Sequence, residues 1–149
     1  MRALVLAASL LAAGPVAAEV PGWMSGAWAT NARLTAPDGA RLRIRCSLDA
    51  ASEGTTWSGV LGCATVQGRF EGRWTVAISG GSAAGQVQFT GPSEDLLQVS
   101  GDAAADAVAL ASGDGQSVRF SPGADGALVV EMNALGPQRL TGALTFEAR

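Results

Sequence analysis

Apolar and polar residues alternate along most of the chain from residue 41 onward. In the segment 41–48 every even-numbered position is apolar, and three of the four odd-numbered positions are Arg. A β-strand with one buried face produces this period of two, whereas a helix repeats its apolar positions about every 3.6 residues. The segment therefore predicts a strand with one apolar and one cationic face.

A second strand is predicted at 56–66, with a turn at 49–55 between the two strands. The two cysteines of the chain, Cys46 and Cys63, lie one in each strand and on the apolar face. Directly opposed positions bring two Cβ atoms within disulfide distance, and an even pair of Cys in an exported protein usually forms a disulfide. We expect a Cys46–Cys63 disulfide in one hairpin; a redox or metal-binding pair is the alternative.

The same alternation continues to residue 149. Turns rich in Gly, Asp, Ser and Pro divide the chain into about nine or ten short strands. We therefore expect an all-β fold, either an antiparallel up-and-down barrel or a barrel-like sandwich, with about 8–10 strands and one disulfide. A transmembrane β-barrel, which carries its apolar side chains on the outer surface, shows the same alternation, so the pattern alone leaves that alternative open.

Residues 1–18 have the features of a secretory signal peptide. Met1 and Arg2 form a positive start, the segment 3–13 is apolar, and small residues precede Glu19. The apolar run is shorter than the roughly 20 residues that a transmembrane helix needs; an uncleaved anchor is the alternative. We expect export to the periplasm, a single domain at 19–149, and no membrane span in the mature chain.

The composition excludes several kinds of chemistry. The chain contains no His, Lys or Tyr, so it has no Ser-His-Asp triad, Schiff-base lysine or P-loop lysine. Its formal net charge of −3 argues against nucleic-acid binding. Hydrolysis by paired carboxylates remains as an enzymatic alternative, with Glu94, Asp95, Asp102 and Asp106 as candidates. We expect a non-enzymatic protein without a cofactor or a metal.

Arginines gather on the polar faces of two predicted strands. They are Arg41, Arg43, Arg45, Arg69 and Arg73. If the strand 56–66 lies between these two strands, the five guanidinium groups share one face, and Arg suits the bidentate recognition of carboxylate and phosphate. The sequence predicts a possible anion face here. The alternative is a solvated face neutralised by Asp49, Glu53 and Glu71.

Three tryptophans, Trp28, Trp57 and Trp74, are the candidates for lining a pocket. Glycines occupy inward positions in the predicted strands, namely Gly59, Gly72 and Gly142. Glycine within a strand removes side-chain volume, and a barrel of about eight strands can hold one small ligand. A small apolar ligand inside the barrel is therefore one expectation. The alternatives are that the tryptophans pack the core and that the glycines permit curvature.

The chain resembles a group of small exported Gram-negative proteins that have no assigned function. Four short motifs carry the resemblance: Gly26-Ala27-Trp28, Asp38-Gly39, Arg45-Cys46 and Leu61-Gly62-Cys63-Ala64. The resemblance spans most of residues 19–149 and implies a periplasmic, barrel-like domain. It implies no particular chemistry, and a binding or envelope-associated role with an apolar ligand or a protein partner is the main expectation.

The chain is also similar to the periplasmic β-barrel inhibitors of secreted metalloproteases. The shared features are an early Gly-x-Trp, one disulfide near the first third of the chain and a lipocalin-like barrel. In that family an N-terminal segment enters the protease cleft, and residues 19–24 are the equivalent segment here. This resemblance implies the alternative function of a protease inhibitor that acts through its N-terminus; the second half of the chain departs from the family pattern.

Overall fold

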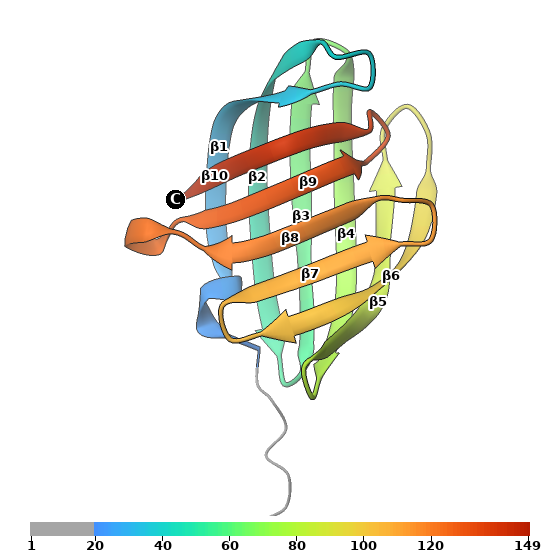
Figure 1. Cartoon of the computed structure of the whole chain (residues 1–149). Coiled ribbons are helices and arrows are strands. Elements are labelled where there is room, and N and C mark those ends of the chain that lie inside the picture. The colour runs from blue at the N-terminus through green and yellow to red at the C-terminus, as the bar shows by residue number, and fades with distance from the viewer. Residues whose placement is uncertain (1–19) are drawn as a thin grey trace, which may run out of the picture.

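Ten antiparallel strands, joined in sequence order by short connections, close into a barrel where the last strand pairs with the first (Figure 1). The computed structural model describes residues 20–149, so the predicted signal peptide at 1–18 lies outside the described residues. The strands are β1 (Gly26–Thr35), β2 (Arg41–Glu53), β3 (Thr56–Thr65), β4 (Gly68–Ser79), β5 (Ser82–Thr90), β6 (Asp95–Ala104), β7 (Ala107–Ser112), β8 (Ser117–Pro122), β9 (Leu128–Leu135) and β10 (Leu140–Ala148). The predicted all-β, up-and-down barrel is confirmed.

Two short 3-10 helices complete the fold. They are η1 (Gly22–Met24), which precedes β1, and η2 (Ala124–Gly126), which lies between β8 and β9. Among residues 20–149, no helix has the length and apolar character needed to cross a membrane.

The β2–β3 hairpin has the predicted register and disulfide, but a shorter turn than expected. Cys46 lies directly opposite Cys63, with their Cα atoms 4.2 Å apart, and the two are bonded. Pairing continues to Glu53 and Thr56, which leaves two residues in the turn instead of the predicted segment 49–55. Gly54 makes this possible because it adopts a φ of 60°, the positive φ that tight hairpin turns require.

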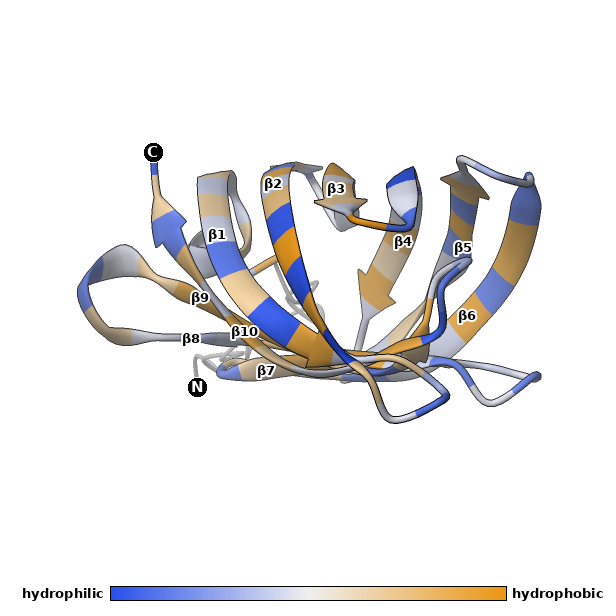
Figure 2. Ribbon diagram, turned by 90° about the horizontal axis from the view of Figure 1, so that it is seen from above, coloured by the Kyte–Doolittle hydropathy of each residue, from blue (hydrophilic) through white to orange (hydrophobic). Residues whose placement is uncertain are grey.

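Apolar side chains face the interior of the barrel, and the outer surface carries the polar ones. Hydrophobic and hydrophilic residues alternate along the ribbons of the strands (Figure 2). Strand β4 shows the rule: its even-numbered positions from Phe70 to Ile78 are buried, whereas Arg73 and Thr75 are exposed. The buried residues of the strands join in one continuous core.

The N-terminal segment closes one end of this core. Met24 is 1% exposed and Val20 is 9% exposed, and both belong to the core cluster. The indole Nε1 of Trp57 donates a hydrogen bond of 3.0 Å to the carbonyl oxygen of Met24. The Nε1 of Trp23 donates to the carbonyl oxygen of Ala105, at 2.8 Å, in the turn between β6 and β7. Residues 20–24, which belong to the segment expected to enter a protease cleft, are therefore packed against the barrel.

Candidate functional site

The three predicted pocket tryptophans are all buried and take part in the core. The ring centroids of Trp57 and Trp74 are 5.2 Å apart, and those of Trp57 and Phe120 are 4.9 Å apart. The Nε1 of Trp28 donates to the carbonyl oxygen of Gly126 at 3.0 Å. The indole of Trp28 is thus hydrogen-bonded to η2, and that of Trp57 to the N-terminal segment. Trp57 and Trp74 also pack against other aromatic rings.

Neighbouring rings fill the space beside the inward-facing glycines. A Cβ atom on Gly59 would come within 2.2 Å of Cζ2 of Trp74, and one on Gly72 would come within 2.8 Å of Cε1 of Phe89. These glycines therefore make room for large side chains of the adjacent strands. They do not provide free volume for a ligand.

The free space left inside the barrel is small and apolar. A cavity of about 40 Å³ lies among core side chains that include Trp74, Met132 and Leu135. A single water takes up about 30 Å³ of liquid, and pockets for drug-sized ligands measure about 300–1,000 Å³. A ligand inside the barrel therefore requires displacement of core side chains. The binding of an apolar ligand among these tryptophans stays a prediction.

The arginines of the chain fall into two groups according to their ion pairs. Nine of the ten arginines lie within residues 20–149. Four of them form ion pairs with carboxylates: Arg73 with Glu71, Arg119 with Glu131, Arg139 with Asp114, and Arg149 with Asp49. The other five form no ion pair with any residue that the structure describes, and we call them the arginine face: Arg33, Arg41, Arg43, Arg45 and Arg69.

The arginine face differs from the predicted set at two positions. Arg73 was expected to belong to it, but its Nε lies 2.7 Å from Oε1 of Glu71, so its charge is compensated. Arg33 was missed because no strand was predicted before residue 41. In the structure β1 pairs with β2 and places Arg33 directly opposite Arg43.

Carboxylates that were expected to neutralise this face lie elsewhere or bind other partners. Asp49 pairs with Arg149 at 2.8 Å, and Glu71 is engaged by Arg73. Glu53, the third of these carboxylates, is exposed at the end of β2 and forms no ion pair with a described residue. None of the three forms an ion pair with the arginine face.

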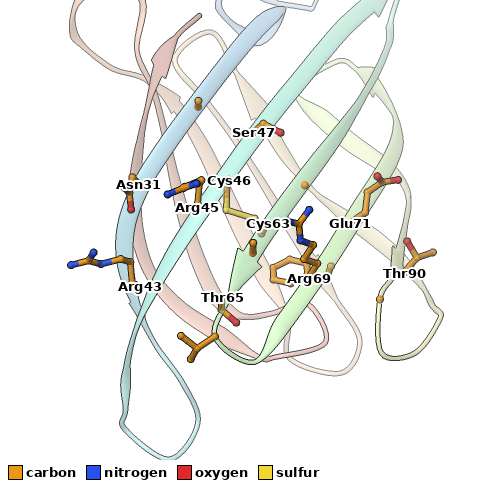
Figure 3. A pocket seen from close by; sticks show the side chains of 16 residues that line it. Asn31, Arg43, Arg45, Cys46, Ser47, Cys63, Thr65, Arg69, Glu71 and Thr90 are labelled. Atoms are coloured by element: carbon orange, nitrogen blue, oxygen red, sulfur yellow. A yellow bond between two sulfur atoms is a disulfide. The ribbon is translucent and has the colours of Figure 1, made fainter.

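A depression of about 800 Å³ lies on the outer surface of strands β1–β5, at the arginine face (Figure 3). Arg43 and Arg45 of β2 line one side, and Arg69 of β4 lines the other. Small residues of β3, Gly62 and Ala64, form the floor between them. Since Ala64 pairs with Arg45 on one side and with Arg69 on the other, the two arginines are two strand spacings apart, or about 10 Å.

Neutral polar groups, one valine and the carboxylate of Glu71, which is paired with Arg73, complete the depression. The amide of Asn31 and the hydroxyls of Ser47, Thr65 and Thr90 line it, together with Val66. Hydroxyl and amide groups beside guanidinium groups can add hydrogen bonds to a bound oxyanion. The arrangement is suited to binding an anion with several oxygen atoms.

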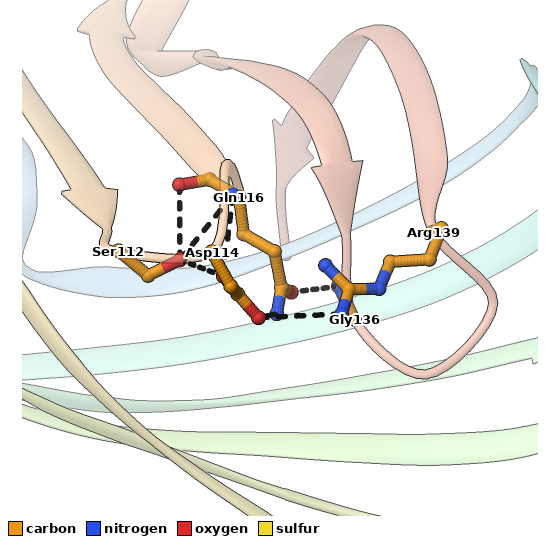
Figure 4. A network of polar contacts seen from close by, with 5 residues as sticks. All are labelled: Ser112, Asp114, Gln116, Gly136 and Arg139. Atoms are coloured by element: carbon orange, nitrogen blue, oxygen red, sulfur yellow. Dashed lines mark hydrogen bonds and ion pairs between the residues drawn. The ribbon is translucent and has the colours of Figure 1, made fainter.

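A second polar network joins the β7–β8 and β9–β10 connections, at the end of the barrel opposite η1 (Figure 4). Gln116 is the only polar side chain among residues 20–149 that is buried, at 2% exposure. Its Oε1 accepts from the amide of Gly136 at 2.9 Å, and its Nε2 donates to Oδ2 of Asp114 at 3.1 Å. Hydrogen bonds from Ser112 and Gln116 to Asp114 lower the pKa of this carboxyl from 3.8 to about 2.

This network links the β7–β8 and β9–β10 connections, and the carboxyl of Asp114 is poorly suited to acid–base catalysis. A carboxyl with a low pKa and several donors stays ionised at neutral pH, so it is a poor general acid or base. The candidate carboxylates Asp95 and Asp102 lie near opposite ends of β6. Within residues 20–149, no three His, Cys, Asp or Glu side chains gather as a metal site would require.

Comparison of the sequence with protein-family models and with curated proteins gives no match. The function is therefore inferred from the residues and their geometry. Of the two predicted sites, the tryptophan set is part of the core, whereas three members of the arginine set, Arg43, Arg45 and Arg69, line an open depression on the surface.

Proposed function

We propose that this chain is an exported, periplasmic, non-enzymatic binding protein whose ligand is an anion held at the arginine face. The signal-peptide features of residues 1–18 support export, and the disulfide suits an oxidising compartment. The observation that carries the proposal is a group of five arginines that form no ion pair with a described residue, three of which, Arg43, Arg45 and Arg69, line one depression.

The electrostatic repulsion among the arginines of this face supports a role in binding. Like charges directly opposite each other on neighbouring strands destabilise a sheet, and Arg33 and Arg43 occupy such positions. The chain has 13 acidic residues against 10 arginines, yet the carboxylates that form ion pairs do so with arginines outside this face. A bound phosphate or carboxylate supplies the missing negative charge, and each charge-assisted hydrogen bond contributes about 1.5–3 kcal/mol.

We do not favour the alternative of a protease inhibitor that acts through residues 19–24. Met24 is 1% exposed, and its carbonyl oxygen accepts the hydrogen bond of Trp57. Insertion of this segment into a protease cleft would first withdraw Met24 from the core. Removal of a buried Met side chain costs about 2–5 kcal/mol, which an inhibitory complex would have to recover.

Isothermal titration with inorganic pyrophosphate tests the proposal. The protein is purified from the periplasm in low salt, and N-terminal sequencing should begin at Glu19. We expect saturable binding that weakens as NaCl is added. Replacement of Arg43 and Arg45 by Gln should weaken binding at least tenfold.

The matched control removes two arginines that form ion pairs elsewhere, in the double variant Arg119→Gln/Arg139→Gln. Its net charge equals that of the first variant, and we expect its affinity to stay within about twofold of the parent, because removal of an exposed ion pair changes little. Equal weakening in both variants would mean that only net charge matters. No saturable binding of pyrophosphate, phosphate or citrate to the parent protein would refute the anion site.

A further inference from the structure

An exposed valine lies at the edge of the arginine depression. Among the large apolar side chains of residues 20–149, only Val66 and Leu96 are largely exposed, and Val66 is 87% exposed. Val66 follows the last residue of β3, in the short turn before β4, and lines the depression with Arg69. Leu96 lies on β6, outside the lining of the depression.

The depression therefore combines cationic sides with an apolar floor and end. Ala29, Gly62 and Ala64 present no polar side chain to a ligand, and Val66 continues this apolar strip beyond the arginines. A small inorganic anion would contact the guanidinium groups and leave the strip uncovered. A ligand that carries a hydrocarbon chain would cover both parts.

We propose, on the basis of the proposed function, that the ligand is amphipathic: a phosphate monoester or a similar anionic head with an attached alkyl or acyl chain. The head lies between β2 and β4, where Arg45 and Arg69 are both paired with Ala64 of β3. The alkyl or acyl chain of the ligand extends over the small residues of β3 to Val66. Burial of each methylene group of the chain adds to affinity, whereas the arginines set the requirement for negative charge.

The length of the gap agrees with a head group of this kind. Arg45 and Arg69 are separated by two strand spacings, about 10 Å between backbones. Because Gly62 and Ala64 are small, a tetrahedral oxyanion can approach the strand surface between them. The hydroxyl of Thr90 lines the same depression and can donate to its oxygen atoms, whereas the hydroxyl of Thr65 already donates to Oε1 of Gln138 at 2.8 Å.

Two phosphate monoesters that differ only in their chain test this inference. Methyl phosphate and dodecyl phosphate, the latter below its micelle-forming concentration, are titrated into the purified mature protein. We expect dodecyl phosphate to bind at least tenfold more tightly, while the neutral dodecyl maltoside does not bind. Equal affinities for the two phosphates, or equal binding of the maltoside, would overturn the inference.

Two single-residue variants test where the hydrocarbon chain of the ligand lies. Val66→Ser should remove most of the advantage of dodecyl phosphate and leave the affinity for methyl phosphate unchanged, because the turn residue is exposed and its replacement leaves the core intact. Leu96→Ser is the matched control, and both affinities should stay as in the parent. An unchanged advantage in Val66→Ser would contradict the placement of the chain. Arg43→Gln/Arg45→Gln should weaken both phosphates.

The outcomes separate this inference from the proposed function. If methyl phosphate and pyrophosphate bind but the dodecyl chain adds nothing, the anion site stands and the amphipathic ligand is wrong. If no anion binds, both fail. Once dodecyl phosphate binding is established, co-sedimentation with phosphatidylglycerol vesicles, compared with phosphatidylcholine vesicles, shows whether the head group is taken from a bilayer or from a free single-chain molecule.

Discussion

Arg33 on β1 and Arg43 on β2 lie directly opposite each other in the barrel, and both are exposed on its outer face. Their neighbours Arg41 and Arg45 lie on the same face of β2. Opposed like charges lower the stability of a sheet, so this pair weakens the free protein. An anion bound at the proposed site would reduce this repulsion.

Removal of one of the two opposed arginines should increase the free energy of unfolding. We expect Arg43→Thr to raise the free energy of unfolding by about 0.2–1 kcal/mol at low ionic strength, because Thr also suits an exposed strand position. The gain should shrink in 0.5 M NaCl, where charges are screened over a few ångströms. Urea unfolding at both salt concentrations measures it, with Arg119→Thr on β8 as the control. A lower stability of Arg43→Thr at low salt would contradict this account.

The disulfide should contribute strongly to stability. Cys46 and Cys63 are separated by 17 residues, and closure of a loop of that size is worth about 3 kcal/mol in the unfolded chain. Replacement of both cysteines by Ala should lower the free energy of unfolding by about 2–5 kcal/mol. Mass spectrometry of the alkylated, non-reduced protein should find no free thiol. Quantitative labelling of both cysteines in periplasmic extract would show that the bond does not form there.

Two glycines of β3 should respond differently to the same substitution. A Cβ on Gly59 would lie 2.2 Å from Cζ2 of Trp74 and 2.8 Å from the carbonyl oxygen of Asp49, whereas a Cβ on Gly62 meets only Oγ of Ser47 at 3.7 Å. We expect Gly59→Ala to destabilise the protein by about 1–3 kcal/mol, because a packed core resists extra volume. Gly62→Ala should change stability by less than about 0.5 kcal/mol. Similar values for the two variants would mean that the ring of Trp74 moves aside without cost.

The carboxyl of Asp114 should make stability depend on pH in the acid range. Hydrogen bonds from Ser112 and Gln116, with a smaller effect of Arg139, lower its pKa from 3.8 to about 2 in the folded protein. Because the folded pKa lies below the unfolded one, the contribution is present above pH 4 and is lost as pH falls from about 4 to about 2. Asp114→Asn should therefore be less stable than the parent at pH 7, and the difference should shrink toward pH 2. Urea midpoints of both proteins across this range provide the measurement, and a constant difference would contradict the assignment.

Alternation over a few residues was enough to predict the local structure. The period of two in 41–48 depends only on which face of a strand is buried, so it is visible without knowledge of the partners. The positions of Cys46 and Cys63 then set the register of one hairpin, and the structure has that register. The first strand escaped prediction because its inward positions Thr30 and Ala32 are only partly buried and carry small or polar side chains.

The candidate site depended on contacts between residues far apart in the chain. The composition and alternation of the sequence by themselves determined an all-β chain, one disulfide hairpin and a row of arginines on a polar face, because each of these is a local property. Only the tertiary structure decided which of those arginines form no ion pair. Asp49 pairs with Arg149, 100 residues away in the sequence, because β1 pairs with both β2 and β10. It also decided that Trp74 and Phe89 fill the space beside the glycines, because the volume inside a barrel is set by side chains that come from neighbouring strands.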